Sequence, residues 1–239
     1  MIKLFKRLFL FILVILLLTL FIKKEFFYNK FETLILNYAE DTEIVLNEVY
    51  LTGRINETKD NIIISLGISI GDPIFSINLE DIRKNINELS WVNYSKVYLH
   101  SFGQLEIEIF EHIAFCVYEH NNKNYLINNE GLKFKNISLN EFPHLFRLNG
   151  KDAISAIKDL PLILNKLEEL DLKILKIERV DSRRWNIFFK QGYYIKLSSE
   201  QPWNSIDDLY SLNNNIDYNN LDFIDLRVQN RMTIKYIQD

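Results

Sequence analysis

Four histidines and one cysteine are the side chains of this sequence best suited to metal binding or nucleophilic catalysis. The histidines are His100, His112, His120 and His144, and no two of them sit at i, i+4 on a helix or in a Cys/His cluster with metal-ligand spacing. Such chemistry needs several groups at short spacing, so surface or strand histidines are favoured over a metal site. Cys116 alternates with strand residues in IAFCVYEH, which favours a buried, inert thiol.

Paired carboxylates are the other candidates for catalysis. Glu168 with Glu169, and Asp207 with Asp208, lie in polar helical stretches, and this context indicates solvated helix faces rather than a general acid and base. The pattern H-E-x-x-H is absent, and LGISIG precedes Asp-Pro instead of opening a helix as a phosphate loop does. We therefore predict a protein that is not an enzyme and that has no metal, cofactor or small-molecule ligand.

The charge balance argues against a nucleic-acid partner. The chain has 28 basic and 32 acidic residues, and without Lys3, Lys6 and Arg7 at its start only 25 basic residues remain. A nucleic-acid-binding surface needs concentrated positive charge to displace counterions from phosphates. With 48% apolar and 25% charged residues, the composition is that of a folded protein.

An uncharged run, LFLFILVILLLTLFI at 8–22, follows these basic residues. As a helix it would cover about 22 Å of a hydrocarbon core about 30 Å thick, which suits a short membrane span or a signal-peptide core. The next residues, KKEFFYNKFETL, offer no small-residue cleavage site, and their lysines and aromatic rings suit a membrane interface. We therefore expect an uncleaved anchor.

The anchor predicts a single-pass protein of the inner membrane. Basic residues flank the run on both sides, so the orientation rests on the short tail at 1–7 and the signal-like start. We expect this tail in the cytoplasm, a juxtamembrane linker at 23–42, and the body of the chain in the periplasm.

A small α+β domain is predicted at 43–111. EIVLNEVYLTG alternates as a strand and ETKDNIIISLGI follows as a helix. Asn78 can cap a second helix, with Asp81 at its third position and an apolar stripe facing the core: Leu79, Ile82, Ile86 and Leu89. WVNYSKVYLHS and QLEIEIFEH then alternate as a hairpin, which gives the order β-α-α-β-β.

The closing stretch FIDLRVQNRMTIKYIQD alternates between apolar and polar residues. Ile224, Leu226 and Val228 share the apolar parity with Met232, Ile234 and Tyr236. One continuous strand would exceed the usual five or six residues or so, and Gln229-Asn230 can form a turn. We predict a hairpin of 223–228 with 231–236, whose second arm ends the sheet with open N–H and C=O groups.

Arg183, Arg184 and Trp185 form the most conspicuous polar cluster. In one interpretation an arginine pairs with an acid of the neighbouring strand, and Trp185 fills the core between sheet and helix. In the other, an exposed arginine meets acidic residues of a partner. The sequence leaves open which arginine is exposed.

Residues 43–111 resemble the POTRA domain of the FtsQ/DivIB family of bacterial cell-division proteins. The resemblance is carried by LTG at a strand end, GISIGDPIFSIN, LSWV before SKVYL, and LEIEIFEHIAF. In the family the last strand usually leads into Glu-Arg and then Pro, whereas this chain has Glu111, His112 and Ile113. A proline common in the family's hairpin turn is replaced by the run at 101–103.

Residues 112–239 resemble the domain that follows the POTRA in this family. The matching segments are NYLINNEGLKF, with Gly131 where the turn needs a positive φ, FPHLFRLNGKDA, ERVDSRRWNIFFKQGYYIKL and IDLRVQNRMTIKY. Of two family glycines in the second segment only Gly150 is present. The resemblance implies an α+β fold overall, whose second domain is β-rich, with a mixed or antiparallel sheet and one or two helices.

The resemblance also implies a scaffold of the division septum. Members of the family hold FtsB and FtsL, link them to the septal peptidoglycan synthase pair FtsW and FtsI, and receive a strand of FtsB at their terminal edge. The implied partner-binding residues are Arg183, Arg184, Arg227, Val228, Arg231, Met232, Thr233, Ile234, Lys235 and Tyr236.

The individual residues match the family's partner-binding positions to different degrees. Arg227 matches a family arginine that contacts the partner, and Val228 stands where several relatives carry tyrosine. Tyr236 stands near the position at which some relatives carry a tryptophan. The alternative to partner binding is that the side chains on one face of this strand pack in the core of their own domain: Met232, Ile234 and Tyr236.

Two other classes compete with a division protein. POTRA modules also occur in outer-membrane assembly and secretion factors, but these lack a retained anchor and continue into a much larger membrane domain. A membrane-anchored periplasmic hydrolase would need a catalytic constellation, and the chain offers none.

Overall fold

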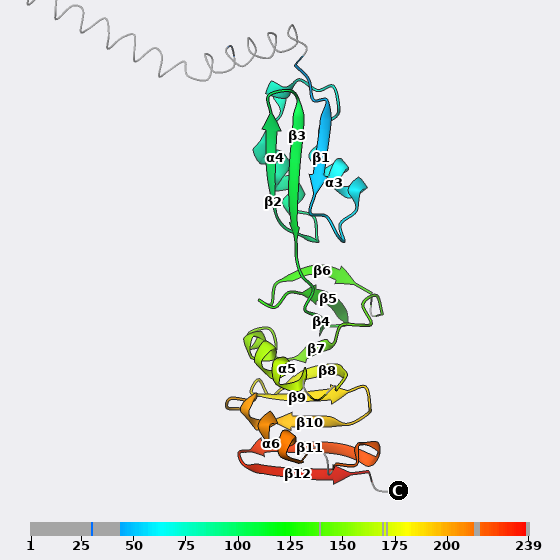
Figure 1. Ribbon diagram of the computed structural model, residues 1–239, viewed down its shortest axis with the longest axis vertical. Coiled ribbons are helices and arrows are strands. Elements are labelled where there is room, and N and C mark those ends of the chain that lie inside the picture. The colour runs from blue at the N-terminus through cyan, green and yellow to red at the C-terminus, as the bar shows by residue number, and fades with distance from the viewer. Residues whose placement is uncertain are drawn as a thin grey trace, which may run out of the picture. The chain divides into compact units, whose positions relative to one another are not determined.

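The computed structural model describes residues 30, 44–138, 140–168, 170, 172–212 and 216–237. The predicted anchor at 8–22 lies outside these residues, as does nearly all of the predicted linker. Within the described ranges, no helix is both long and apolar enough to cross a membrane. The chain forms two compact units that divide between Glu111 and His112 (Figure 1).

The first unit is a three-stranded sheet with helices on one face. Its elements are β1 (Glu48–Thr52), α3 (Lys59–Leu66), η1 (Ile74–Ser76), α4 (Leu79–Asn87), β2 (Val92–His100) and β3 (Gln104–Glu111). β3 lies in the centre, parallel to β1 and antiparallel to β2. This is the predicted β-α-α-β-β order.

Local signals in the sequence set the helices of this unit. The Asn78 side chain caps α4 by accepting the N–H of Glu80 at 3.0 Å, and it donates to the Asp81 carboxylate at 2.8 Å. Ile82 and Ile86 of α4 are buried against the inward residues of β3, which are Leu105, Ile107 and Ile109. The predicted cap and stripe are confirmed.

The second unit is built on one mixed sheet of nine strands. Its elements are β4 (Cys116–His120), β5 (Lys123–Ile127), β6 (Lys133–Ile137), β7 (Arg147–Gly150), η2 (Ile157–Asp159), α5 (Leu160–Glu168), β8 (Ile174–Val180), β9 (Arg184–Phe189), β10 (Tyr194–Leu197), η3 (Asn204–Ile206), α6 (Asp207–Leu212), η5 (Tyr218–Asn220), β11 (Leu221–Val228) and β12 (Arg231–Tyr236). The strand order is β12-β11-β10-β9-β8-β7-β4-β5-β6, so β12 and β6 form the two edges (Figure 1).

Pairing in this sheet is antiparallel except at three places. β4 runs parallel to β7, β7 to β8, and β10 to β11. Between β5 and β6 the chain turns at Gly131, whose φ of 87° confirms the positive value expected there. The mixed sheet and the few helices agree with the β-rich fold that the sequence predicts.

The two faces of the nine-stranded sheet differ. On one face, α5 and α6 cover a core that includes Trp185, which is fully buried and donates its indole N–H to Asp159 at 3.0 Å. Trp185 therefore fills the core as expected. On the other face, a row of three aromatic rings with a lysine at each end crosses strands β8 to β12: Lys176, Phe188, Tyr194, Phe223 and Lys235.

The carboxylate of Glu111, at the end of β3, fastens the turn at residues 55–57. Glu111 accepts the backbone N–H groups of Ile55, Asn56 and Glu57 at 2.8–2.9 Å, and also the Asn56 side-chain amide. Burial raises the pKa of the Glu111 carboxyl, but these hydrogen bonds outweigh burial and lower the pKa below its usual value. Ionised Glu111 thus stabilises the turn that leads into α3.

Glu111→Gln is expected to reduce the free energy of unfolding of this unit by about 2 kcal/mol at pH 7, because charged hydrogen bonds are lost. A carboxyl whose pKa is lowered in the folded state stabilises above its unfolded pKa of about 4.3 and stops doing so as pH falls through the folded pKa. The difference between the variant and the wild type should therefore shrink below about pH 4.

Urea unfolding of residues 44–111, followed by the fluorescence of buried Trp91, measures this difference. Glu108→Gln is the matched control, because Glu108 makes an ion pair with Lys96 in which both side chains are largely exposed. An effect of Glu111→Gln that does not change between pH 7 and pH 3 would contradict the prediction.

Candidate protein-binding site

A shallow depression of about 470 Å³ lies where β9, β11 and β12 end or begin. It is lined by Arg183, Arg184, Ser199, Asp225, Arg227, Val228, Arg231 and Thr233. Most of the residues predicted to contact a partner line this depression. They come from two segments that are far apart in the sequence, one around Arg184 and one around Arg227. Asp225 and Ser199 were not predicted. The sequence signal for Asp225 is its position two residues before Arg227, on the polar side of the same alternating strand.

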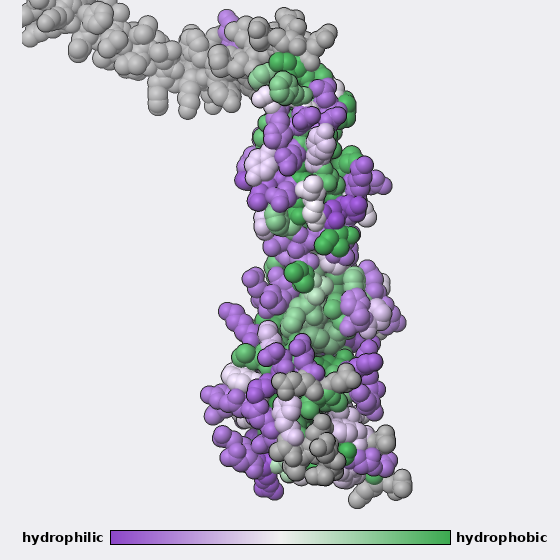
Figure 2. Space-filling model, in the orientation of Figure 1, coloured by the Kyte–Doolittle hydropathy of each residue, from purple (hydrophilic) through white to green (hydrophobic). Residues whose placement is uncertain are grey.

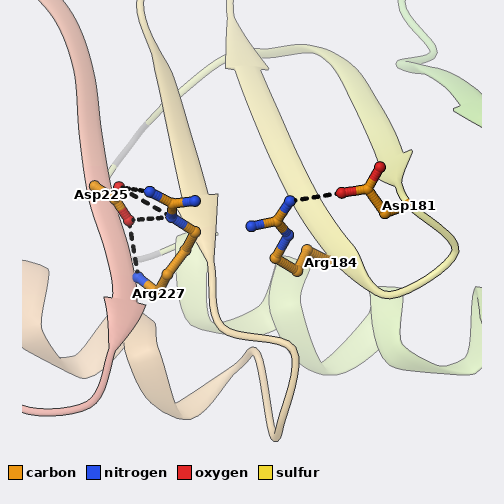
Figure 3. A network of polar contacts seen from close by, with 4 residues as sticks. All are labelled: Asp181, Arg184, Asp225 and Arg227. Atoms are coloured by element: carbon orange, nitrogen blue, oxygen red, sulfur yellow. Dashed lines mark hydrogen bonds and ion pairs between the residues drawn. The ribbon is translucent and has the colours of Figure 1, made fainter.

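Arg227 is held by an acid of its own strand. Its Nε donates to Asp225 Oδ1 at 2.8 Å and one terminal nitrogen donates to Asp225 Oδ2 at 2.6 Å (Figure 3). These hydrogen bonds lower the pKa of the Asp225 carboxyl, so the pair stays ionised. The Arg227 side chain remains 43% exposed and retains donors for a further acceptor.

Arg184 is also held by an aspartate, at the start of β9. It donates to Asp181 at 2.7 Å, and both arginines of Figure 3 lie on the sheet face opposite the helices. Asp181 belongs to the turn before β9, so the expectation of an acid on the neighbouring strand was wrong. A tight turn between β8 and β9 brings this closer acid within reach.

Besides Arg227, two other arginines of the depression are exposed, Arg183 and Arg231. Neither has an ion-pair partner in the part of the chain that the structure describes. The question of which residue of the Arg183–Arg184 pair is exposed is therefore answered in favour of Arg183. Since Asp225 is the only acid among the described lining residues, positive charge dominates the depression.

The hairpin of β11 and β12 is confirmed. It turns at Gln229-Asn230, where Asn230 adopts a φ of 58°, and β12 is the last strand of the sheet. The Ile237 N–H donates to the Asn220 carbonyl at 2.8 Å. Because the direction of backbone polar groups alternates along a strand, the N–H and C=O of Tyr236 and Ile234 point away from β11 toward the open edge.

The side chains of β12 divide between the core and solvent. Met232 and Ile234 are half-buried and pack on the core beneath the helices, which agrees with the inward alternative. Tyr236 is 41% exposed and does not belong to that core. Thr233 lines the depression, while Lys235 pairs with Asp222 at 2.8 Å.

Val228 departs from the predicted alternation. It is 58% exposed, whereas Ile224 and Leu226 of the same parity are fully buried. The β11–β12 register shifts between Asp225 and Val228, and this irregularity ends the inward alternation. Val228 is therefore an exposed apolar residue at the rim of the depression, although it shares the parity of the buried Ile224 and Leu226.

Two short patterns that also occur in hydrolases are present in the sequence: G-I-S-I-G at 67–71 and S-A-I-K at 155–158. Ser69 is exposed and follows helix α3, whereas a nucleophile elbow lies between a strand and a helix. Ser155 and Lys158 are both exposed, in a turn and η2. Neither serine thus has the setting of an activated nucleophile.

The candidate metal ligands are also dispersed. His100 pairs with Glu106 at 2.9 Å, His112 stacks on Phe134, and Cys116 is buried. Among the described residues, no three His, Cys, Asp or Glu side chains gather to hold a metal ion. Of the acidic pairs, Asp207 pairs with Lys166, and Glu169 lies outside the described residues.

Comparison with known families matches both units. Residues 45–112 match the model for the FtsQ-type POTRA domain, and residues 116–227 match the model for the C-terminal region of the cell division protein FtsQ/DivIB. A cell division protein FtsQ from Rickettsia bellii is 30% identical over 203 residues, which cover 83% of this chain and 75% of the relative. The chain belongs to the FtsQ/DivIB family.

Other FtsQ proteins of this family are similar over the same region. The FtsQ of Rickettsia conorii is 29% identical over 80% of this chain and 72% of the relative. The FtsQ of Rhizobium meliloti is 23% identical over 80% of this chain and 62% of its own length. The match to the FtsQ/DivIB C-terminal model ends at residue 227, so Val228 and β12 lie beyond it.

The exposure of Val228 gives a test of the β11 register. Val228→Ser is expected to change the free energy of unfolding by less than about 0.5 kcal/mol, because an exposed residue loses little on substitution. Leu226→Ala should cost about 2–5 kcal/mol, because a fully buried side chain leaves a cavity.

Urea unfolding of residues 112–239 followed by near-ultraviolet circular dichroism measures both changes. Comparable losses for the two variants would place Val228 in the core and contradict the described register.

Proposed function

We propose that the chain is a scaffold of the division septum that captures an FtsB-like partner by strand addition to β12. The observation that supports the proposal is the arginine-lined depression directly beside an open strand edge. Through the same partner the chain would hold an FtsL-like protein and recruit the septal synthase pair FtsW and FtsI. It would act by binding and not by catalysis.

The proposal includes the place of the chain in the cell. A cytoplasmic tail at 1–7, an inner-membrane span at 8–22 and a linker at 23–42 would hold the POTRA domain at 43–111 and the β domain at 112–239 in the periplasm. Family membership supports a septal location, and the uncharged run between basic residues supports the span.

The backbone of β12 would supply the basic affinity. A partner strand of ordinary length forms about five hydrogen bonds with an edge, each worth about 1 kcal/mol. Association costs about 4–15 kcal/mol, so the backbone alone gives weak binding. Side chains beside the edge must therefore add affinity and select the partner.

The arginines of the depression would supply that selectivity. Guanidinium groups bind carboxylates through two parallel hydrogen bonds, so an acidic side chain next to the added strand is the complementary group. Arg183 and Arg231 are free to receive such groups, and Arg227 is already oriented by Asp225. Val228 and Tyr236 offer exposed apolar surface at the two ends of the hairpin.

Arg227→Glu is expected to weaken binding of the FtsB-like ectodomain at least tenfold, or about 1.4 kcal/mol. The change removes the oriented cation and sets a second carboxylate beside Asp225, which repels an acidic partner. Isothermal titration calorimetry with residues 44–239 measures the affinity.

Lys190→Glu is the matched control for this prediction. It makes the same reversal of charge at an exposed position just after the other end of β9, about 20 Å from Arg184 at ordinary strand spacing. Equal loss of affinity in both variants would point to a general charge effect and would argue against the arginine-lined depression as the binding site.

The backbone contribution can be separated from the side chain at Tyr236. Tyr236→Ala removes the ring, and Tyr236→Pro removes in addition an N–H that points toward the open edge. Strand addition predicts that the proline variant binds about fivefold more weakly than the alanine variant, the value of one hydrogen bond.

The same calorimetric titration compares the two variants, and circular dichroism checks that both stay folded. Neither variant disturbs the Ile237–Asn220 bond that holds the end of β12. Identical affinities would mean that the partner does not use this part of the edge.

A further inference from the structure

The first unit has an end at which three loops meet, and we define it as the POTRA tip: residues 44–47, 69–76 and 101–103. Its loops are joined by backbone hydrogen bonds to the segment 44–47. Leu46 N–H donates to the Asp72 carbonyl at 2.8 Å, Gly71 N–H donates to the Leu46 carbonyl at 2.8 Å, and Asn47 N–H donates to the Gly103 carbonyl at 2.7 Å. The tip is therefore a defined surface.

Large apolar side chains project from this tip. Phe102 is 83% exposed, Ile70 is 62% exposed and Phe75 is 53% exposed. Figure 2 shows hydrophobic surface at this end of the unit. The only ionisable side chain in the tip is Asp72, whose carboxylate accepts the N–H of Ser69 at 2.8 Å. A water-facing end of a domain normally carries more charge than this.

The backbone holds Phe102 outward. Gly103 has a φ of 73°, and a Cβ at this position would lie 1.9 Å from the Val45 carbonyl oxygen. The Asn47 side-chain amide donates to the Phe102 carbonyl at 3.1 Å on the other side. The Phe102–Gly103 peptide is thus fastened to the segment 44–47 while the Phe102 ring stays exposed.

The position of the tip along the chain suggests what covers it. The chain enters the described unit at Ile44, within the tip, and the uncharged run ends at Ile22. The intervening stretch 23–43 spans at most about 70 Å even when fully extended. A tether of this length keeps the tip at high effective concentration beside the bilayer, so even weak affinity is enough for contact.

We propose that the POTRA tip docks on the bilayer surface, with Phe102, Ile70 and Phe75 inserted among the lipid headgroups. The inference rests on the membrane anchor proposed above. Aromatic and aliphatic side chains partition into the interfacial region, and a tip with almost no charge gains nothing from anionic lipid. Docking is therefore driven by apolar burial, and is insensitive to salt and to lipid charge.

The test places an environment-sensitive NBD fluorophore on the tip of the full chain in nanodiscs. Phe102→Cys is labelled, and Cys116 can remain because it is fully buried and burial raises the pKa of its thiol. Ile55→Cys is the matched control. It is 80% exposed but lies at the opposite end of the unit, where its N–H bonds to Glu111.

Docking predicts blue-shifted emission at position 102, at least twofold stronger quenching by doxyl-labelled lipid than at position 55, and the same result in neutral and anionic nanodiscs. Equal weak quenching at both positions would overturn the proposal. A blue shift without lipid quenching would also overturn it, since residues 23–43 or a second copy would then cover the tip. Failure of the chain to enter nanodiscs would overturn the anchor and the docking together.

A second measurement separates this inference from the function proposed above. Phe102→Ser combined with Ile70→Ser should at least halve doxyl quenching of a label at position 75, introduced as Phe75→Cys. The same double variant should bind the FtsB-like ectodomain with unchanged affinity, because the substituted residues belong to the first unit. Unchanged quenching would overturn docking through these side chains.

Discussion

An open sheet must end twice, and the unpaired backbone groups of its two outer strands are the constraint on which the second unit depends. Every inner strand has a hydrogen-bonded neighbour on both sides, but β6 and β12 each leave one side open. β6 carries Lys133 and Lys135, and lysines at an edge discourage further pairing. β12 carries one lysine, Lys235, which pairs with Asp222.

Much of the fold could be predicted because its signals are local. The Asn78 cap, the stripe of α4, the alternation of β3 and the turn at Gly131 each depend on residues a few positions apart. The continuous nine-stranded sheet could not be predicted in the same way, since the parallel pairing of β10 with β11 joins strands separated by η3 and α6. The exposure of Val228 could not be predicted from alternation, because a register shift between Asp225 and Val228 interrupts the strand's period of two.

The arginines of the candidate site could be predicted from the sequence, but the acids that pair with them could not. Resemblance pointed to the arginines, and the hairpin pattern placed their strands at the edge. The acids that orient them, Asp181 and Asp225, are ordinary turn and strand residues by sequence. An arginine already held in a two-pronged ion pair loses less side-chain freedom when a further carboxylate arrives, and this lowers the entropic cost of recognition. The unpaired Arg183 and Arg231 keep that freedom until a partner binds.

The strand order of the second unit has a consequence for how the molecule is assembled during synthesis. From β7 onward, each new strand pairs with one that has already emerged from the ribosome: β7 with β4, β8 with β7, and so on to β12 with β11. Pairing between successive strands keeps contacts short in sequence and avoids long waits for a distant segment. The sheet thus lengthens in one direction as the chain is made, and its newest strand is always its exposed boundary. In the described sheet, β12 is the strand that this succession of pairings leaves at the edge.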